Sequence, residues 1–283
     1  MDKRMRRSDE DFSFSCLPST RRKQFFDCLK NRWLLFLEVG LLLAFSSLLL
    51  VGLLFAEDLV TYNIFNDETM EETAKTGLLS AMDLTFASLI AVAILIVVLP
   101  LGGILRIYRS LIYDEGVFFF SDFGKGFKGT WKLCLMLGIV LGASYFACAF
   151  YKKMITVPIL SYIPYGLLLF LVLPWALTAL SYGSIYSSSF GVSLQNGFVL
   201  TVKSYWKALL CVLAFAAPLF LLFIPSMAFR YIAFIACFVF YYPLVLFAFY
   251  LVDIACFDEQ INGKLGNGLY HKGLYDENIN ADE

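Results

Sequence analysis

Histidine and charged residues are scarce in this 283-residue sequence. The one histidine, His271, lies in a polar C-terminal segment, which excludes His-based metal sites and Ser-His-Asp triads. Asp, Glu, Lys and Arg together make up only 16% of the residues, whereas 60% are apolar. A soluble chain of this length cannot bury so much apolar surface, so the composition excludes a soluble protein and predicts a membrane protein.

Motifs with a known chemical mechanism are also lacking. The sequence has no Walker A, G-x-S-x-G or H-E-x-x-H motif. Its seven cysteines include no C-x-x-C pair, and most lie in or beside apolar segments, as small core residues and reduced thiols do. We therefore expect a protein that is not an enzyme, with no catalytic or metal-ligating residue, no cofactor and no nucleic-acid partner.

Six apolar segments are each long enough to cross the hydrocarbon core of a bilayer as a helix. Their expected bounds are 33–55, 83–105, 133–151, 154–180, 208–227 and 231–252. The sequence therefore predicts an all-α integral membrane protein, with a six-span helical bundle over residues 33–253. A basic N-terminal segment (1–32), with an interfacial helix that starts at Ser19 or Thr20, precedes this bundle, and a polar tail (254–283) follows it.

Basic residues gather on one side of the expected membrane layer. Eighteen of the 22 Lys and Arg residues lie on the same side as both termini. The four on the other side are Lys75, Lys152, Lys153 and Arg230. Because cytoplasmic loops carry an excess of Lys and Arg, we expect a multi-pass protein of the cytoplasmic membrane with both termini in the cytoplasm.

An aromatic and lysine-rich segment occurs twice, 75 residues apart. The copies are GVFFFSDFGKGFKGTWK (116–132) and GVSLQNGFVLTVKSYWK (191–207). In each copy, apolar residues recur every four positions and would form one stripe on a helix. The stripes are Phe119, Phe123, Phe127 and Trp131, and Leu194, Phe198, Val202 and Trp206. This pattern predicts a parallel internal repeat, with units at about 83–151 and 154–227 and two cytoplasmic amphipathic helices.

The stripe helices are consistent with three roles. Their aromatic rings could lie at the level of the lipid headgroups while their lysines reach the phosphates of anionic lipids. Alternatively, the stripes could close the cytoplasmic side of a central cavity, or they could dock a partner such as a membrane transport complex. The lysines concerned are Lys128, Lys132, Lys203 and Lys207.

A few polar residues lie within or beside the expected spans. Glu38 is an acid well inside an apolar segment, and it would either pair with Arg106 or Arg109 or couple protons or ions. Tyr165 and Tyr242 lie beside prolines, which occur in four of the six expected spans. Transporters build sites at such broken helices, but prolines also merely shape the packing of membrane helices.

The segment from Arg106 to Lys132 resembles the YesL-like family of small membrane proteins of Gram-positive bacteria. In that family a basic residue ends a span, and an acidic pair, here Asp114-Glu115, precedes a D-F-x-x-x-F-K-x-x-W/F-K segment. The matching residues are Asp122, Phe123, Phe127, Lys128, Trp131 and Lys132. The resemblance implies a polytopic protein usually met beside carbohydrate import systems, and it brings no catalytic residues.

Two functional hypotheses follow. The first is a non-enzymatic accessory or interaction protein, linked to carbohydrate uptake by resemblance only. The second is a small transporter or channel with a pore at the repeat interface, for example in a homo-oligomer. A transporter should place Glu38, Tyr165 and Tyr242 around one hydrated cavity, whereas an accessory protein should have a packed centre.

Overall fold

The computed structural model describes residues 17–155, 157–186, 188–266 and 268–275, and over these residues the chain forms helices and no strands. Within these ranges, five helices are long and apolar enough to cross a membrane. They become six if Met227–Phe240 and Tyr242–Leu265, bent by 42° against each other, form one span. The expected all-helical fold is confirmed, and the long apolar helices are consistent with a multi-pass membrane protein.

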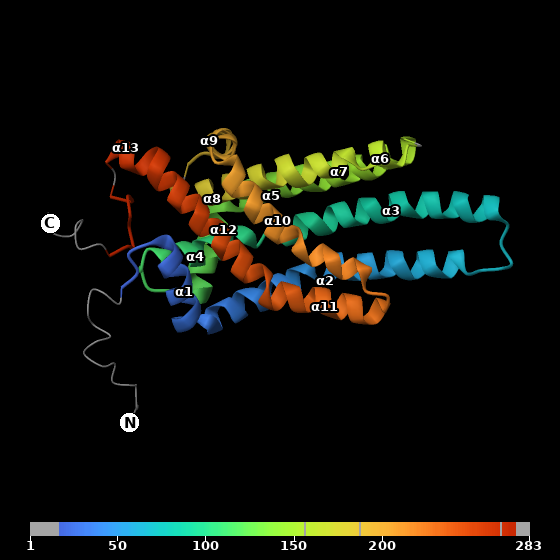
Figure 1. The fold of residues 1–283 in the computed structure, drawn as a ribbon, viewed down its shortest axis with the longest axis horizontal. Helices are drawn as coiled ribbons and strands as arrows, with labels where there is room; N and C mark the ends of the chain where they lie inside the picture. Colours follow the sequence, from blue (N-terminus) through green and yellow to red (C-terminus); the bar gives the residue numbers. More distant parts are fainter. Residues whose placement is uncertain (1–16, 156, 187, 267, 276–283) are drawn as a thin grey trace, which may run out of the picture.

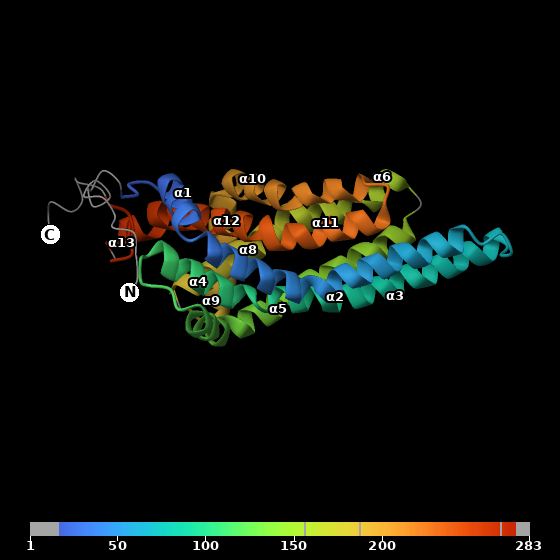
Figure 2. The same ribbon diagram turned by 90° about the horizontal axis from the view of Figure 1, so that it is seen from below.

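The first half of the chain consists of long, mostly uninterrupted helices. In order they are α1 (Arg21–Asn31), α2 (Trp33–Phe65), α3 (Glu72–Val98), α4 (Leu101–Ile112) and α5 (Phe119–Met154). Thr20 caps α1 as predicted, because its hydroxyl accepts a hydrogen bond from the Lys23 N–H at 3.3 Å. Helices α2 and α3 form a hairpin that extends away from α1, and α5 packs along α3 and α4 (Figures 1 and 2).

The second half consists of shorter pieces. In order they are α6 (Pro158–Ser161), α7 (Ile163–Leu167), the π-helical η3 (Leu168–Val172), α8 (Leu173–Tyr186), α9 (Phe190–Lys203), α10 (Tyr205–Ala216), the 3₁₀-helical η4 (Ala217–Phe223), α11 (Met227–Phe240), α12 (Tyr242–Phe257), the π-helical η5 (Asp258–Asn262) and α13 (Gly263–Leu265). Helix α9 is seen nearly end-on in Figure 1, so it lies across the long axis of the bundle. The end at which α1 and α13 lie is called the terminal end below (Figure 1).

The most tightly buried part of the core lies towards the terminal end. Tyr108 of α4 and Phe247 of α12 are fully buried, with ring centroids 5.1 Å apart. Phe36 of α2 and Phe25 of α1 contact the same Phe247 ring, at 5.0 and 5.9 Å between centroids. One aromatic cluster therefore joins the N-terminal helices to the last span.

Several helices continue beyond the bounds that hydropathy predicts, among them α2 and α12. Helix α2 ends at Phe65 rather than near residue 55, and Asp58 on this extension forms an ion pair with Arg230 at 2.8 Å. At the other end of the chain, Asp258 and Asn262 are buried, so the first residues of the expected polar tail belong to the bundle. Residues 1–16 of the expected N-terminal segment and 276–283 of the tail lie outside the described residues.

Prolines account for three of the irregular points in the second half. A proline lacks the N–H that would donate to the carbonyl four residues earlier. The π-helical η3 precedes Pro174, the 3₁₀-helical η4 contains Pro218, and the bend between α11 and α12 precedes Pro243. The carbonyls deprived of this donor are those of Phe170, Ala214 and Val239.

Other helices contact these three carbonyls. Tyr205 Oη donates to the Phe170 carbonyl at 3.2 Å. Tyr241 Oη likewise donates to the Ala214 carbonyl at 2.7 Å, which also accepts a hydrogen bond from the Ala217 N–H. The Val239 carbonyl faces Gly40 of α2, where any Cβ atom would overlap the oxygen, so the close approach of α2 and α11 requires glycine at this position.

The tyrosine donors are testable by removal of one hydroxyl. Tyr241→Phe should lower the stability of the protein in detergent by about 1 kcal/mol, because it takes a donor from a carbonyl in apolar surroundings. Tyr151→Phe is the matched control, since Tyr151 is exposed and its hydroxyl makes no hydrogen bond within the described ranges.

Pro218→Ala restores an N–H to residue 218 and so tests whether the Tyr241 hydroxyl compensates for the donor that the proline lacks. In that background, thermal unfolding should show a smaller loss for Tyr241→Phe than in the natural sequence. An equal loss in both backgrounds would show that the hydroxyl does not compensate for the proline.

Candidate functional site

The first aromatic stripe lies on the initial part of α5, which continues without a break into the apolar segment. Phe119 and Phe123 are half-buried against the core, and the Phe123 ring fills the space above Gly103 of α4. Phe127 and Trp131 are exposed, at 38% and 44% of their surface. One half of the stripe thus packs on the bundle, and the other half is free to contact lipid or a partner.

The second stripe is divided between two helices. Helix α9 ends at Lys203 and α10 begins at Tyr205, so Phe198 and Trp206 do not share one helix. The expected single stripe is wrong here, because Ser204 leaves the helical conformation and directs its hydroxyl to the Leu200 carbonyl at 2.7 Å. Phe198 and Trp206 are nevertheless both exposed, at 59% and 77%.

The lysines beside the stripes are exposed. Lys128, Lys132 and Lys203 make no ion pair with any described residue, and the Lys132 ammonium lies 5.7 Å from the centroid of the Trp131 ring. Lys207 forms an exposed ion pair with Glu259 at 3.4 Å. The free ammonium groups are therefore available to external anions.

Glu38 does not take part in a polar site. It is exposed on α2, whereas Phe36, Val39 and Gly40 of the same helix face the bundle. Within the described part of the chain, it forms no ion pair. The expected pairing of Glu38 with Arg106 or Arg109 is therefore wrong, because its side chain leaves α2 on the exposed side.

The two arginines of α4 have different surroundings. Arg109 Nη1 donates to the Ser184 carbonyl at 3.3 Å, and its guanidinium lies 5.7 Å from the centroid of the Tyr113 ring. Arg106 makes no hydrogen bond or ion pair with a described residue, and its Nε atom is buried. Arg106 is thus a partly buried cation without a direct partner in the described chain.

A polar network holds the terminal end together. The Arg21 guanidinium of α1 donates to the Asp258 carboxylate at 2.8 Å, and their side chains are only 11% and 4% exposed. Asn262 Nδ2 donates to the same carboxylate at 2.8 Å. Nearby, Lys272 donates to Glu115 at 2.6 Å. These contacts join α1, the α4–α5 turn and the residues after α13.

The Glu115 carboxyl also responds to the arginines of α4. Burial opposes its charged form, but the hydrogen bond and charge of Lys272 and the charges of Arg109 and Arg106 outweigh this effect and lower its pKa. Glu115 is therefore an anion that is already engaged by Lys272.

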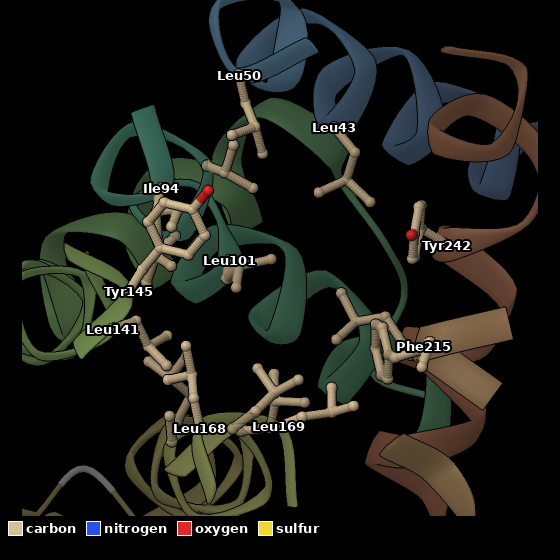
Figure 3. Close-up of a pocket in the computed structure, with 18 of the residues that line it drawn as sticks. Leu43, Leu50, Ile94, Leu101, Leu141, Tyr145, Leu168, Leu169, Phe215 and Tyr242 are labelled. Carbon is tan, nitrogen blue, oxygen red and sulfur yellow. The ribbon is translucent and has the colours of Figure 1, made fainter. Parts of the chain in front are cut away.

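A cavity of about 540 Å³ lies in the middle of the bundle (Figure 3). Apolar side chains from α2–α5, η3, α8, α10, η4, α11 and α12 line it, and Leu43, Leu141 and Leu169 are among those that surround the space in Figure 3. Within the described residues, its polar side chains are Tyr145, Tyr165 and Tyr242. The structure thus brings Tyr165 and Tyr242 to one cavity, but this cavity is apolar and does not include Glu38.

Asp253 is a buried acid that the sequence interpretation treated only as the end of the sixth span. It is 3% exposed, and its Oδ1 atom accepts a hydrogen bond from Thr178 Oγ1 of α8 at 3.4 Å. Its Oδ2 atom has no hydrogen-bond partner, and no cation pairs with it, among the described residues. The apolar residues that follow Asp253, Ile254 to Phe257, were the signal that it lies inside the bundle.

The described residues contain no group of three His, Cys, Asp or Glu side chains that could hold a metal ion. No protein-family model, curated protein or solved structure matches the chain. Its function must therefore be argued from the cavity, the exposed stripes and the buried charges.

The Arg21–Asp258 pair gives a prediction for the terminal end. Asp258→Asn should destabilise the protein by about 3 kcal/mol, because it leaves the Arg21 guanidinium buried without its counter-ion. Glu259→Gln is the matched control, since its pair with Lys207 is exposed and should contribute less than about 1 kcal/mol. Thermal unfolding of both variants in the same detergent tests this, and equal losses would contradict the assigned role of the buried pair.

Proposed function

We propose that this chain is a non-enzymatic accessory or interaction protein of the cytoplasmic membrane, and that its core accommodates an apolar guest rather than a polar solute. The observation that supports this proposal most directly is the apolar lining of the central cavity. A polar solute that entered it would lose its hydrogen bonds to water and find three tyrosine hydroxyls in return, at a cost of about 1–3 kcal/mol for each unsatisfied group.

A link to carbohydrate uptake rests on the resemblance of residues 106–132 to the YesL-like family. The apolar cavity favours a role beside an importer over a role as the sugar pathway itself. The exposed aromatic rings of Phe127, Trp131, Phe198 and Trp206 offer an amphipathic surface for this association, together with the free lysines next to them.

The proposal includes the internal repeat. Within the surface helices, however, the two copies correspond at an offset that differs from the 75 residues of the sequence match. Helices α5 and α9 begin at Phe119 and Phe190, which are 71 rather than 75 residues apart. A pair of hydrogen bonds has the same 71-residue offset. Thr130 Oγ1 donates to the Gly126 carbonyl at 2.9 Å, and Thr201 Oγ1 donates to the Gly197 carbonyl at 2.7 Å, in each case four residues earlier in the chain.

Further support for the repeat comes from Gly126 and Gly197. Gly126 lies against the backbone of Gly102 and Gly103 in α4, and Gly197 lies against Ala179 in α8. In both places a Cβ atom would overlap the preceding helix. Each proposed unit thus uses a glycine to bring its surface helix close to the helix before it.

The orientation is also part of the proposal. The terminal end carries α1 with its basic residues, so the distribution of basic residues favours placing this end in the cytoplasm, where anionic headgroups of the inner leaflet would contact exposed lysines. The far end, where α2 and α3 meet, carries the acidic residues Glu57, Asp58 and Glu72.

The cavity itself favours a second candidate, a small transporter at the repeat interface. Because the lining is apolar, the cargo of such a transporter would be hydrophobic, for example a lipid chain. This candidate and the accessory role share the prediction of a dry cavity, whereas a channel for ions or sugars requires water in it.

Cysteine accessibility tests whether the cavity is dry. Leu141→Cys and Leu169→Cys, each in a background without native cysteines, should resist a membrane-impermeant maleimide in inside-out vesicles and react after denaturation in SDS. Lys128→Cys is the exposed control and should react at once. Rapid reaction of both cavity cysteines in intact vesicles would refute the proposal and favour a hydrated pathway.

Partner binding is tested by photocrosslinking in native membranes. A photoreactive phenylalanine analogue at Phe198 should crosslink to a component of a membrane transport complex. The same analogue at Phe220, which is 76% exposed on η4, should crosslink to lipid alone. Identical products at both positions would argue against a specific docking surface on α9.

A further inference from the structure

A second, polar pocket of about 310 Å³ lies between α4, α5 and the end of α8. Arg106 and Lys125 contribute cationic side chains, and Thr130, Ser184 and Ser188 contribute hydroxyls. The remaining lining positions are glycines, which leave the space between the helices open. None of the motifs in the sequence assigns a ligand to this pocket.

The cations of the pocket have no ion-pair partner among the described residues. Neither Arg106 nor Lys125 forms an ion pair with any residue that the structure describes, and the Arg106 Nε atom is buried without an acceptor. Arg106 is partly buried and Lys125 is exposed, and two cations that line one pocket repel each other unless an anion lies between them.

The acids closest along the chain are engaged elsewhere. Glu115, whose carboxyl interacts electrostatically with Arg106, accepts a hydrogen bond from Lys272. Asp122 of α5 accepts a hydrogen bond from the Phe118 N–H at 2.9 Å, at the start of its own helix. Within the described chain, these acids therefore form no ion pair with Arg106 or Lys125, which leaves both cations available to an external anion.

The hydroxyl groups that line the pocket already take part in hydrogen bonds within the protein. Thr130 donates to the Gly126 carbonyl, Ser184 donates to the Ser181 carbonyl, and the Ser188 hydroxyl is hydrogen-bonded to the Ser193 hydroxyl. With these donors occupied, recognition depends on the guanidinium fork and the ammonium group. A tetrahedral oxyanion satisfies both, because arginine binds two oxygens of a phosphate while lysine acts as a point charge.

The position of the pocket along α4 and α8 fits a phosphate at the edge of the membrane. On α4, Leu101 lines the apolar cavity and Gly102 lines the polar pocket. On α8, Leu180 lines the cavity and Gly183 lines the pocket. We propose that the pocket of Arg106 and Lys125 binds a phosphate group, either of a phospholipid headgroup or of a free phosphate. This site does not depend on the accessory role proposed above.

Glycine positions allow the pocket to be blocked without removing its charges. A Cβ atom at Gly129 would meet no atom within 4 Å, although Gly129 lines the pocket, so the side chain of Gly129→Leu would occupy the pocket space. A Cβ atom at Gly124 also meets no atom within 4 Å, but Gly124 does not line the pocket. Gly124→Leu is therefore the matched control.

The experiment measures the thermal stability of the purified full-length protein in a neutral detergent. One arm titrates phosphatidic acid in mixed micelles, and the other titrates inorganic phosphate against chloride at constant ionic strength. The variants are Arg106→Gln, Lys125→Gln and Gly129→Leu. The controls are Gly124→Leu and Lys128→Gln, which removes an exposed lysine of the same helix outside the pocket.

At least one probe should stabilise the wild type and both controls in a saturable manner. Arg106→Gln and Lys125→Gln should weaken the apparent affinity about tenfold each, the loss of one charge-assisted contact, and Gly129→Leu should abolish saturable binding. Stabilisation by phosphatidic acid alone would identify the headgroup as the source of the phosphate, and an equal effect of inorganic phosphate would identify the free ion.

Two results would overturn the proposal. One is the absence of a saturable shift in the wild type with both probes. The other is an unchanged affinity in Arg106→Gln and Lys125→Gln, which retain the backbone of the pocket and do not depend on whether Gly129→Leu folds.

Discussion

Backbone hydrogen bonding in apolar surroundings is the constraint on which the rest of this structure depends. A helix satisfies it unless a proline removes a donor. Two of the three interrupted sites in the second half have a tyrosine from another helix as a replacement donor, at the carbonyls of Phe170 and Ala214. At the third, α2 approaches through Gly40 instead. In the first half, Pro100 separates α3 from α4, whereas α5 runs without interruption.

The same interruptions shape the central cavity. Leu173 precedes Pro174, Leu219 follows Pro218 and Tyr242 precedes Pro243, and all three line the cavity. Helices that bend or change pitch at these points cannot pack side chain against side chain along their whole length, because regular ridges and grooves are lost there. The space in the middle of the bundle is therefore a consequence of where the prolines stand, and its apolar character follows from their leucine-rich surroundings.

Hydropathy was enough to predict the class of fold and the apolar segments, since a helix is the obligatory form of a long apolar run in lipid. The N-cap at Thr20 could also be predicted, because it depends only on residues that are close in the sequence. The break at Ser204 was not predicted, because the residues around it are compatible with a continuous helix and the interruption depends on one serine side chain. The length of α2 could not be read from hydropathy either, since its extension is held by Arg230, a residue far away in the chain. The predicted pairing of Glu38 with Arg106 or Arg109 was wrong for a similar reason, because the side of a helix that is exposed depends on the helices packed against it.

The polarity of the interior bears on the proposed function, because a polar solute and a lipid-like guest require different surroundings. Along α8, the lining changes from leucines to Gly183 and Ser184 within about one turn, so the apolar and charged environments are adjacent but distinct. A sugar that moved through the bundle would exchange water for hydrocarbon over the whole length of the cavity, and the hydroxyls of Tyr145, Tyr165 and Tyr242 are too few to replace its hydration. A hydrocarbon chain incurs no such cost in the cavity, and an anionic group incurs little at its charged edge. The interior is thus arranged like one leaflet of the bilayer itself, which favours lipid-like guests over the solutes of an importer.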